Sequence, residues 1–336
     1  MNRKILFIGS HLSKSTGTKG ISEKIYERLN KDYNIKLVST YKNKLLRFLD
    51  IVTNALFSNY QIMHIDVYSN KGFIYADIAS LIAKLRNKKL IMTLRGGKLA
   101  EKFQNEPTKM KKVFNRADYL QSPSLFLIDF FKKYNINIKY MPNFIDLKFF
   151  PYNRKKIEKY SLLWVRAFSE EYQPELAIKV FYKIKKKYPN TIFYMIGPDK
   201  GNLNECKKLS KELGIYNDIK FLGKVKNEEL FKFYNKCHVY LNTTKYESFG
   251  VAVLEAAACG IPIISTNVGE IPFLWEDNKD ILLVENNDIE GFEKNIIKIF
   301  EDDSFASKLS LNARKKAENY DWNLIKKKWV DLLNNI

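Results

Sequence analysis

Short apolar runs alternate with amphipathic stretches along almost the whole of this chain. The runs hold five to seven residues each, as in "KILFIGS", "QIMHIDV" and "TIFYMIG", while stretches such as "IYADIASLIAKLRNK" repeat apolar residues at helical spacing. Runs of this length are typical of strands buried on both faces, and their alternation with helices is typical of parallel sheets. The pattern therefore predicts an α/β fold in which helices cover both faces of doubly wound parallel sheets.

The alternation is interrupted near residue 150, where "NFIDLKFFPYNRKK" combines Pro, Asn and a run of charges. A chain of 336 residues also exceeds what one hydrophobic core usually supports. We therefore expect two doubly wound domains, residues 1–150 and 151–321, followed by a C-terminal helix at about 322–336. The apolar residues on one face of that helix are Trp322, Ile325, Trp329 and Leu332.

Several enzyme classes lack their signatures in this sequence. There is no GxxxxGK[ST] for a P-loop and no GxGxxG for a dinucleotide site. The three histidines, the absence of HExxH and the absence of any Asp-x-Asp leave no set of metal ligands. The three cysteines share no CxxC spacing, and the apolar run at the N-terminus is too short for a signal peptide. We expect a soluble, cytoplasmic protein with no bound metal and no cofactor.

The net charge of +20 is distributed unevenly. Residues 1–150 contain 27 Lys and Arg against 11 Asp and Glu, whereas the remainder contains 30 against 26. A genome that favours lysine would raise the positive charge of both halves equally. The asymmetry therefore indicates an anionic partner for the first half. A membrane surface, a nucleic acid or a phosphorylated substrate would fit. Nucleic acid is the weakest of the three, because no recognition motif accompanies the charge.

The segment "ESFGVAVLEAAACGIPIIST", residues 247–266, places two glutamates around the start of an apolar helix. Ser248 is the expected N-cap and Gly260 the glycine that ends the helix, so residues 249–251 would form the first turn. First-turn N–H groups after a strand form an anion site. Glu247 could then bind a sugar and Glu255 a ribose, on either side of a diphosphate. An ordinary capped helix with one exposed glutamate explains the same residues, and the spacing alone does not exclude it.

This segment resembles the donor-binding segment of glycosyltransferase family 4, retaining enzymes of the GT-B fold. Further matches occur in the family's order: "ADYLQSPS", "YMPNFIDLKFF", "WVRAF", "MIGPD" and "FLGKV". The resemblance covers residues 4–329. It implies two Rossmann-like domains with an inter-domain cleft, an N-terminal acceptor-binding domain, a C-terminal donor-binding domain, and a last helix that packs back on the first domain.

The resemblance also implies roles for individual residues. Glu247 would hold sugar hydroxyls, Glu255 the ribose, and Arg166 would balance the phosphate charge. The diphosphate would lie on the backbone of Phe249, Gly250 and Val251. The nucleoside pocket would be lined by Gly197, Pro198, Gly223 and Val225.

The sequence departs from the family at four positions. No lysine stands near Tyr172, where the family has one, and Arg95 replaces a histidine that often follows the fourth strand. We expect Arg95 to supply the missing positive charge from the opposite domain. Glu270 replaces the second glycine of "VGG". The first loop has Gly17 and Gly20 instead of adjacent glycines.

Two residues of "QIMHIDVYS" are further candidates. We expect His64 and Asp66 at a strand end that faces the cleft, where either could orient an acceptor hydroxyl. A buried structural role fits each of them equally well.

The resemblance implies a retaining, metal-independent, hexosyltransferase-type enzyme. It would move a sugar from a nucleoside diphosphate to an acceptor hydroxyl in bacterial capsule, O-antigen or exopolysaccharide synthesis. A GT-B nucleotide-sugar epimerase and a non-catalytic nucleotide-sugar-binding subunit are the alternatives.

The stretch "YKNKLLRFLDIVTNALF", residues 41–57, combines a wide apolar face with Lys42, Lys44 and Arg47. Such a helix most often covers the sheet of its own domain. In a half this basic, it could also dock on an anionic bilayer. We therefore expect peripheral attachment to the inner leaflet of the cell membrane and a lipid-linked saccharide as acceptor.

Overall fold

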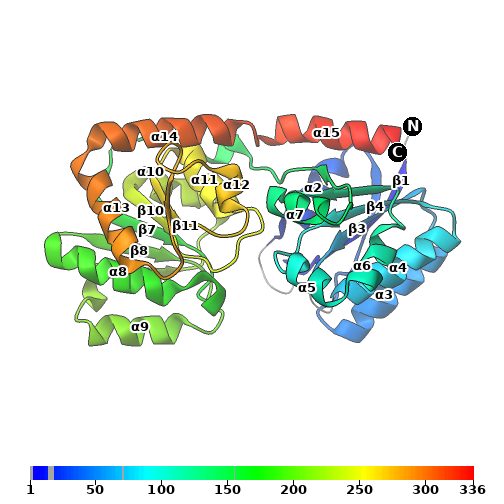
Figure 1. The fold of residues 1–336 in the computed structure, drawn as a ribbon, viewed down its shortest axis with the longest axis horizontal. Helices are drawn as coiled ribbons and strands as arrows, with labels where there is room; N and C mark the ends of the chain where they lie inside the picture. The colour runs from blue at the N-terminus through cyan, green and yellow to red at the C-terminus, as the bar shows by residue number, and fades with distance from the viewer. Residues whose placement is uncertain (1–2, 14–18, 70–71, 155) are drawn as a thin grey trace. The chain divides into compact units, whose positions relative to one another are not determined.

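The computed structural model of the chain describes residues 3–13, 19–69, 72–154 and 156–336. The chain forms two compact units (Figure 1). The first comprises Met1–Asn143 together with Ile325–Ile336, and the second comprises Phe144–Leu324.

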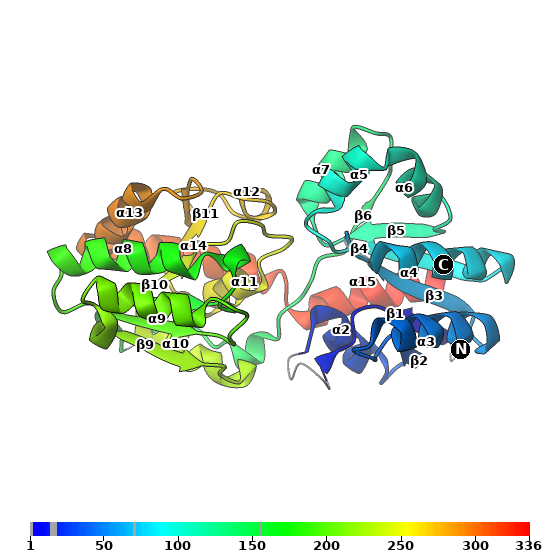
Figure 2. The ribbon, with the colours of Figure 1, turned by 90° about the horizontal axis from the view of Figure 1, so that it is seen from below.

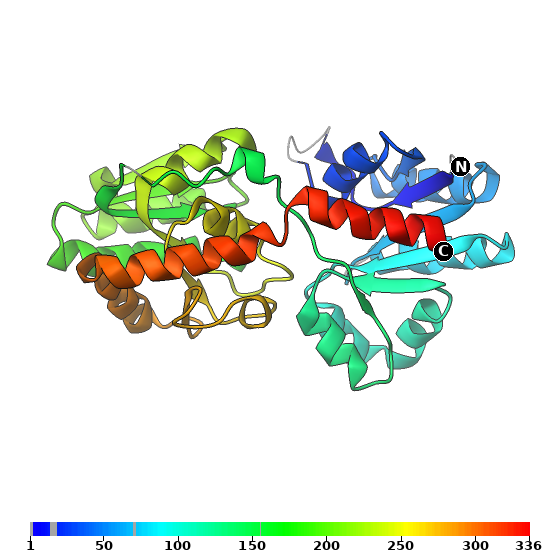
Figure 3. The ribbon, with the colours of Figure 1, turned by 90° about the horizontal axis from the view of Figure 1, so that it is seen from above.

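Six parallel strands form the sheet of the first unit, in the order β2-β1-β3-β4-β5-β6. Figures 2 and 3 show α3 and α4 on one face of this sheet and α15 on the other. The elements in chain order are β1 (Lys4–Ile8), α2 (Ile21–Leu29), β2 (Asn34–Val38), α3 (Lys44–Phe57), β3 (Ile62–Val67), α4 (Gly72–Leu85), β4 (Lys89–Leu94), α5 (Leu99–Asn105), α6 (Pro107–Phe114), β5 (Tyr119–Ser122), α7 (Leu125–Lys132), β6 (Lys139–Tyr140) and the greater part of α15 (Trp322–Asn335).

A second sheet of six parallel strands, in the order β12-β11-β10-β7-β8-β9, forms the centre of the second unit. Helices α8 and α14 lie on opposite faces of it (Figures 2 and 3). The elements are η1 (Leu147–Phe149), β7 (Glu158–Val165), η2 (Glu170–Tyr172), α8 (Pro174–Lys187), β8 (Ile192–Ile196), α9 (Leu203–Glu212), η3 (Tyr216–Asp218), β9 (Ile219–Gly223), η4 (Asn227–Glu229), α10 (Leu230–Lys236), β10 (Cys237–Asn242), α11 (Val251–Cys259), β11 (Ile263–Thr266), α12 (Ile271–Leu274), β12 (Leu282–Val284), α13 (Ile289–Glu301) and α14 (Asp303–Glu318).

Both sheets confirm the predicted α/β architecture with parallel strands. All six residues of β3 and all six of β10 are buried, because helices cover both faces of these central strands. In the second unit the side chains of Trp164 on β7, Phe181 on α8 and Ile296 on α13 share one apolar core. None of the helices in the described parts of the chain is long and apolar enough to cross a bilayer.

The order of strands determines where each unit can hold a ligand. In the first sheet the chain moves from β1 to β2 on one side and then to β3 on the other. In the second it moves from β7 to β8 on one side and later to β10 on the other. In such sheets the loops diverge beyond the carboxyl ends of the two central strands, and ligands bind there. The residues that follow β1 and β3, and those that follow β7 and β10, are therefore the candidates for ligand binding.

Candidate functional site

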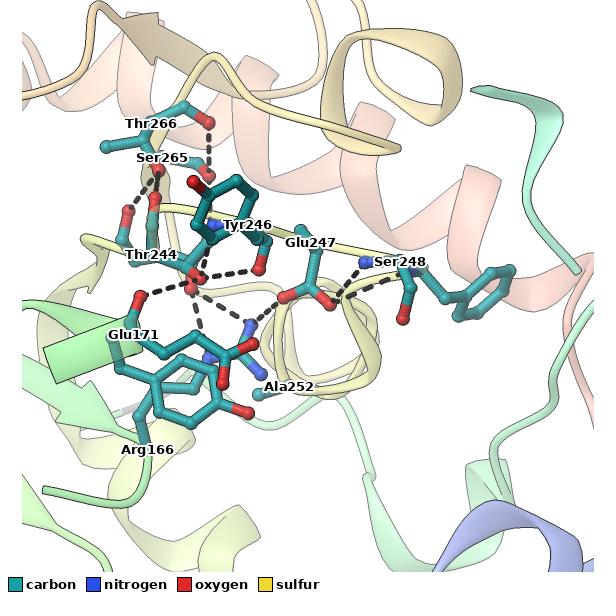
Figure 4. Close-up of polar contacts among 12 residues, drawn as sticks. Arg166, Glu171, Thr244, Tyr246, Glu247, Ser248, Ala252, Ser265 and Thr266 are labelled. Atoms are coloured by element: carbon teal, nitrogen blue, oxygen red, sulfur yellow. Dashed lines mark hydrogen bonds and ion pairs between the residues drawn. The ribbon is translucent and has the colours of Figure 1, made fainter. Parts of the chain in front are cut away.

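An arginine and a glutamate meet beyond the ends of β7 and β10 (Figure 4). Arg166 directly follows β7, and Glu247 lies in the loop between β10 and α11. Arg166 Nη2 lies 2.5 Å from Glu247 Oε2, and the two side chains are only 11% and 10% exposed. The switch point of the second sheet thus holds a nearly buried ion pair whose members lie 81 residues apart in the sequence.

Arg166 is fixed by further contacts. Its Nε and Nη2 groups donate to Asn242 Oδ1 at 3.1 and 3.0 Å, and its guanidinium carbon lies 5.2 Å from the centre of the Tyr172 ring. Burial alone would lower the pKa of Arg166, but the Glu247 carboxylate outweighs burial and the pKa is raised. Within the described residues the hydrogen bonds of Arg166 use Nε and Nη2. A guanidinium has five N–H donors, so those of Nη1 remain for an incoming anion.

The second carboxylate oxygen of Glu247 organises its own loop. Glu247 Oε1 accepts hydrogen bonds from the backbone N–H groups of Ser248 at 3.2 Å and Phe249 at 3.4 Å. The Glu247 carbonyl accepts from the N–H of Glu270 at 3.0 Å. A Cβ at Gly269 would lie 2.1 Å from that carbonyl oxygen, and φ at Gly269 is +55°. Only glycine allows this approach, so the loop after β11 fixes the backbone of Glu247.

Helix α11 begins later than predicted. Its N-cap is Gly250, with φ +84°, and its first helical residue is Val251. The expectation of Ser248 as N-cap is therefore wrong, because the left-handed backbone at Gly250 ends the preceding loop. Phe249 is buried, and its N–H is directed at Glu247. The N–H groups without an acceptor inside the helix are those of its first turn, starting at Val251.

The other end of α11 agrees with the prediction. Gly260 is the C-cap, with φ +73°, and its N–H returns to the carbonyls of the last turn. Glu255 lies in the second turn of α11 and is only 5% exposed. Its Oε1 accepts a hydrogen bond from Asn227 Nδ2 at 3.4 Å. Asn227 begins the short helix η4, which follows Val225 closely in the chain. Glu255 thus stands beside the segment predicted to line the nucleoside pocket.

The ends of β7, β8 and β9 bring four predicted residues together. The N–H of Gly197 donates to the carbonyl of Gly223 at 2.8 Å, and the N–H of Arg166 donates to the carbonyl of Ile196 at 3.0 Å. The Pro198 carbonyl accepts from Phe168 at 2.9 Å. A Cβ at Gly197 would lie 1.6 Å from the Arg166 carbonyl oxygen. Gly197 is therefore needed for the close packing of these strand ends, whatever binds above them.

Of the two predicted glycines of the first loop, the structure describes only Gly20. Gly17 lies outside the described residues. Gly20 is the N-cap of α2, and its N–H donates to Glu23 Oε2 at 3.0 Å. Its φ of −72° is open to any residue, so its backbone gives no reason for a glycine.

Arg95 is held inside the first unit. Its Nε lies 2.5 Å from Asp66 Oδ1, and its Nη1 donates to Asn143 Oδ1 at 2.7 Å. Both members of the ion pair are buried. Burial alone would raise the pKa of Asp66, but the charge of Arg95 outweighs burial and the pKa is lowered. Asp66 is therefore ionised and balances the charge of Arg95 in this structure.

The sequence predicts His64 at a strand end, and this prediction is wrong. It lies in the middle of β3, where its ring stacks on Phe7 at 4.1 Å and meets the edge of Trp329 at 5.5 Å. Its Nε2 lies 2.8 Å from Thr93 Oγ1. Burial lowers the pKa of His64 to about 3, so the ring is neutral near pH 7. These contacts favour the structural interpretation of His64.

His11 is a buried polar residue that no sequence motif predicted. It follows β1, is buried, and its Nδ1 donates to the Val38 carbonyl at 2.6 Å. Its Nε2 lies 2.9 Å from Ser22 Oγ. The only signal that could have indicated it is its place just beyond the first strand, where a doubly wound sheet binds ligands.

Known proteins share sequence with the second half of this chain. The family model "Glycosyl transferases group 1" matches residues 147–316. A D-inositol 3-phosphate glycosyltransferase of Corynebacterium urealyticum is 27% identical over 169 residues, which cover 48% of this chain and 40% of the relative. O-antigen chain mannosyltransferase B of Escherichia coli is 29% identical over 104 residues, which cover 31% of this chain and 27% of the relative. The match therefore spans less than half of the length of these relatives.

Solved structures match nearly the whole chain, and two of them serve as examples. Sucrose-phosphate synthase (tll1590) from Thermosynechococcus elongatus has a TM-score of 0.80 at 16% identity, over 99% of this chain and 98% of the other. Anabaena Alr3699/HepE, in complex with UDP-glucose, has a TM-score of 0.77 at 18% identity, over 99% and 100%. Because the identity is so low, this similarity establishes the fold alone.

The burial of His64 predicts a pH dependence of stability. The unfolded chain takes up a proton at His64 below about pH 6.5, whereas the folded chain does so only near pH 3. The free energy of unfolding should therefore fall as the pH drops from 6.5 towards 3, by up to about 1.4 kcal/mol per pH unit from this group. Urea unfolding of His64→Gln should show a shallower pH dependence than the wild type. An unchanged slope would contradict the assignment.

Proposed function

Because the chain belongs to the family of group 1 glycosyl transferases and has the GT-B fold, we propose that it transfers a sugar from a nucleoside diphosphate to an acceptor hydroxyl with retention of configuration. The pathway that we propose is the synthesis of a bacterial surface polysaccharide. One observation carries the proposal: Arg166, Glu247 and the start of α11 converge at the switch point of the second sheet.

The donor site follows from this convergence. The diphosphate would lie between the Nη1 donors of Arg166 and the N–H groups at the start of α11, both of which favour anions. The sugar would then contact Glu247 at the rim. The nucleoside would extend towards Glu255 and the turns at Gly197, Pro198, Gly223 and Val225. Alr3699/HepE was solved with UDP-glucose, so that compound is the first donor to test.

The proposed chemistry depends on the leaving group. Breaking the bond to the anomeric carbon leaves negative charge on the nucleoside diphosphate. Arg166 and the positive end of α11 are fixed before the reaction, so they stabilise that charge without reorganising. The same diphosphate would help to deprotonate the acceptor hydroxyl on the face from which it departs, which accounts for retention.

The two glutamates can be tested separately. Replacing Glu255 by Ala should weaken the binding of UDP-glucose by about 1.5–3 kcal/mol, because a charge-assisted hydrogen bond to the ribose is lost. Isothermal titration measures the change. Glu228→Ala is the control, since it removes an equal charge from the exposed part of the adjacent turn. Wild-type affinity in Glu255→Ala would remove the ribose assignment.

Glu247→Gln should lower turnover more than the affinity for free UDP, because its proposed partner is the sugar. If UDP binding collapses instead, Glu247 acts on the diphosphate through Arg166 and not on the sugar. Isomerisation of UDP-glucose without any acceptor would favour an epimerase, and binding without turnover would favour a non-catalytic subunit.

The proposed site stabilises the leaving diphosphate with protein groups. Activity should therefore be unchanged in excess EDTA. Within the described residues, no three His, Cys, Asp or Glu side chains are grouped as a metal site requires. Loss of activity in EDTA, with recovery on adding magnesium or manganese, would show that a metal takes part.

We also propose that the first unit docks on an anionic membrane through α3. Helix α3 buries Ile51 and Ala55, whereas five large apolar side chains on it are exposed. We call these residues the α3 apolar face: Leu45, Leu46, Leu49, Leu56 and Phe57. Covering its own sheet accounts for only part of the apolar surface of this helix. The cations at its start complement anionic lipid, at roughly 1 kcal/mol for each residue near the surface.

The protein should sediment with phosphatidylglycerol vesicles, be released by salt, and stay in the supernatant with phosphatidylcholine vesicles. Leu45→Ser with Leu49→Ser should abolish sedimentation. Leu311→Ser is the control, because Leu311 is exposed to a similar degree on α14 of the second unit. Equal recovery in the supernatant with both lipids and at all salt concentrations would remove the membrane proposal and favour a soluble acceptor.

A further inference from the structure

A cavity of about 420 Å³ lies at the amino edge of the second sheet, opposite the proposed donor site. It adjoins the starts of three neighbouring strands. Lys159 is the second residue of β7, His238 is the second residue of β10, and Pro262 directly precedes β11. Helix α14 contributes Asp303 and Ser307 to the lining. The volume is within the range of small-molecule sites, about 300–1,000 Å³.

The cavity is lined by a guanidinium that no carboxylate neutralises among the described residues. Arg154 Nη1 donates to the carbonyls of Tyr234 at 2.9 Å and Cys237 at 3.1 Å, at the end of α10. Its Nη2 donates to the His238 carbonyl at 3.4 Å. Burial lowers the pKa of Arg154 to about 10, and no Asp or Glu opposes this effect. Carbonyl groups compensate a buried charge only in part, so Arg154 favours an anion beside it.

Arg154 also has hydrogen-bond donors to offer an anion. A guanidinium carries five N–H groups, and the three bonds to carbonyls use both on Nη1 and one on Nη2. The N–H of Nε and the second N–H of Nη2 therefore remain. Two adjacent N–H groups of this kind match two oxygens of one anion.

Two further donors line the cavity. His238 Nδ1 accepts a hydrogen bond from the N–H of Tyr160 at 3.3 Å, and burial lowers the pKa of His238 to about 4. The ring is therefore neutral near pH 7 and carries its proton on Nε2. Lys159 lies 3.2 Å from Asp303, but their side chains are 63% and 69% exposed. An ion pair this exposed is weak, so Lys159 can turn to a ligand.

Positive charge gathers around this cavity although the second half of the chain is nearly balanced. Of the described residues that line it, only Asp303 is acidic, whereas Arg154 and Lys159 are basic. Lys156 is exposed two residues after Arg154 and belongs to the run of charges that interrupts the sequence pattern near residue 150. The cavity therefore attracts anions.

The arrangement of donors suits a phosphate better than a carboxylate. Arg154, Lys159 and His238 come from three separate segments. A carboxylate offers two oxygens in one plane, whereas a phosphate monoester offers three oxygens around its phosphorus and nearly two negative charges. Apolar surface is available beside the donors, since Tyr152 and Ile157 line the cavity and are 45% and 37% exposed.

We propose that this cavity binds a small phosphate monoester. The phosphate binds Arg154 and Lys159, with His238 as a further donor, and the carbon part of the ligand lies against Tyr152 and Ile157. This inference does not depend on the proposed sugar transfer.

The proposed ligand and the donor would occupy opposite ends of α11. Ser310 lines the cavity and donates to the carbonyl of Gly260, the C-cap of this helix. The diphosphate of the donor is proposed at the other end, beyond Gly250. Both ligands can therefore bind at the same time, and this separates the cavity from the donor site in an experiment.

Isothermal titration with phenyl phosphate tests the cavity, with saturating UDP present to occupy the donor site. One phenyl phosphate should bind per chain. It should bind more tightly than inorganic phosphate, which has no ring to lie against the apolar side chains. It should also bind more tightly than benzoate, which has fewer oxygens and a smaller charge.

Variants identify the residues that bind. Arg154→Gln should weaken the binding of phenyl phosphate about ten-fold or more, because charge-assisted hydrogen bonds are lost. Arg154 also holds the end of α10, so two surface variants give an independent test. Lys159→Gln should weaken binding about two- to five-fold, and Asp303→Asn should strengthen it by a similar factor. Lys279→Gln and Glu276→Gln are the controls, since these residues form an ion pair of similar exposure outside the lining.

Absence of binding while UDP is present would overturn the site. Equal changes in the controls, or a change in the same direction for Lys159→Gln and Asp303→Asn, would also overturn it. Benzoate that binds as tightly as phenyl phosphate would overturn the phosphate assignment and favour a carboxylate ligand.

Discussion

The ion pair between Arg166 and Glu247 is the interaction on which the second unit's site depends. It joins the end of β7 to the loop before α11, and Asn242 at the end of β10 holds the guanidinium in place. A nearly buried charge without a partner would destabilise the fold strongly. With its partner, the arginine is kept rigid and charged beside the start of α11. An anion that binds there meets a site that needs no rearrangement of the backbone.

The first unit uses the same arrangement with different residues. Arg95 after β4 binds Asp66 near the end of β3, and Asn143 accepts the second hydrogen bond, as Asn242 does for Arg166. In each unit a buried arginine is neutralised by one carboxylate at the carboxyl edge of a parallel sheet. The two pairs differ in accessibility. The side chains of Arg166 and Glu247 keep 11% and 10% of their surface exposed, whereas the side chain of Asp66 is fully buried.

Periodicity in the sequence was sufficient for the architecture but not for the local geometry of the sites. Buried runs and amphipathic helices predicted both parallel sheets, because these patterns arise from burial alone. The start of α11 was placed wrongly, since "SFGV" contains a favourable capping serine, whereas the structure uses a left-handed glycine at 250. Every residue of β3 is buried, so its sequence contains no change of polarity that marks where the strand ends. His64 was therefore predicted at the end of the strand, although it lies in the middle. The pairing of Arg166 with Glu247 spans 81 residues and leaves no local pattern to detect.

The first unit is discontinuous in sequence, and this affects the order in which it can form. Residues 325–336 belong to it, and Trp329 packs against His64, which in turn stacks on Phe7. A ribosome adds about 5–20 residues per second, and domains generally fold as they emerge. The second unit is therefore complete before the first has received the helix that covers His64. During synthesis the core of the first unit therefore remains open, and accessible to chaperones and proteases, until residues 325–336 emerge.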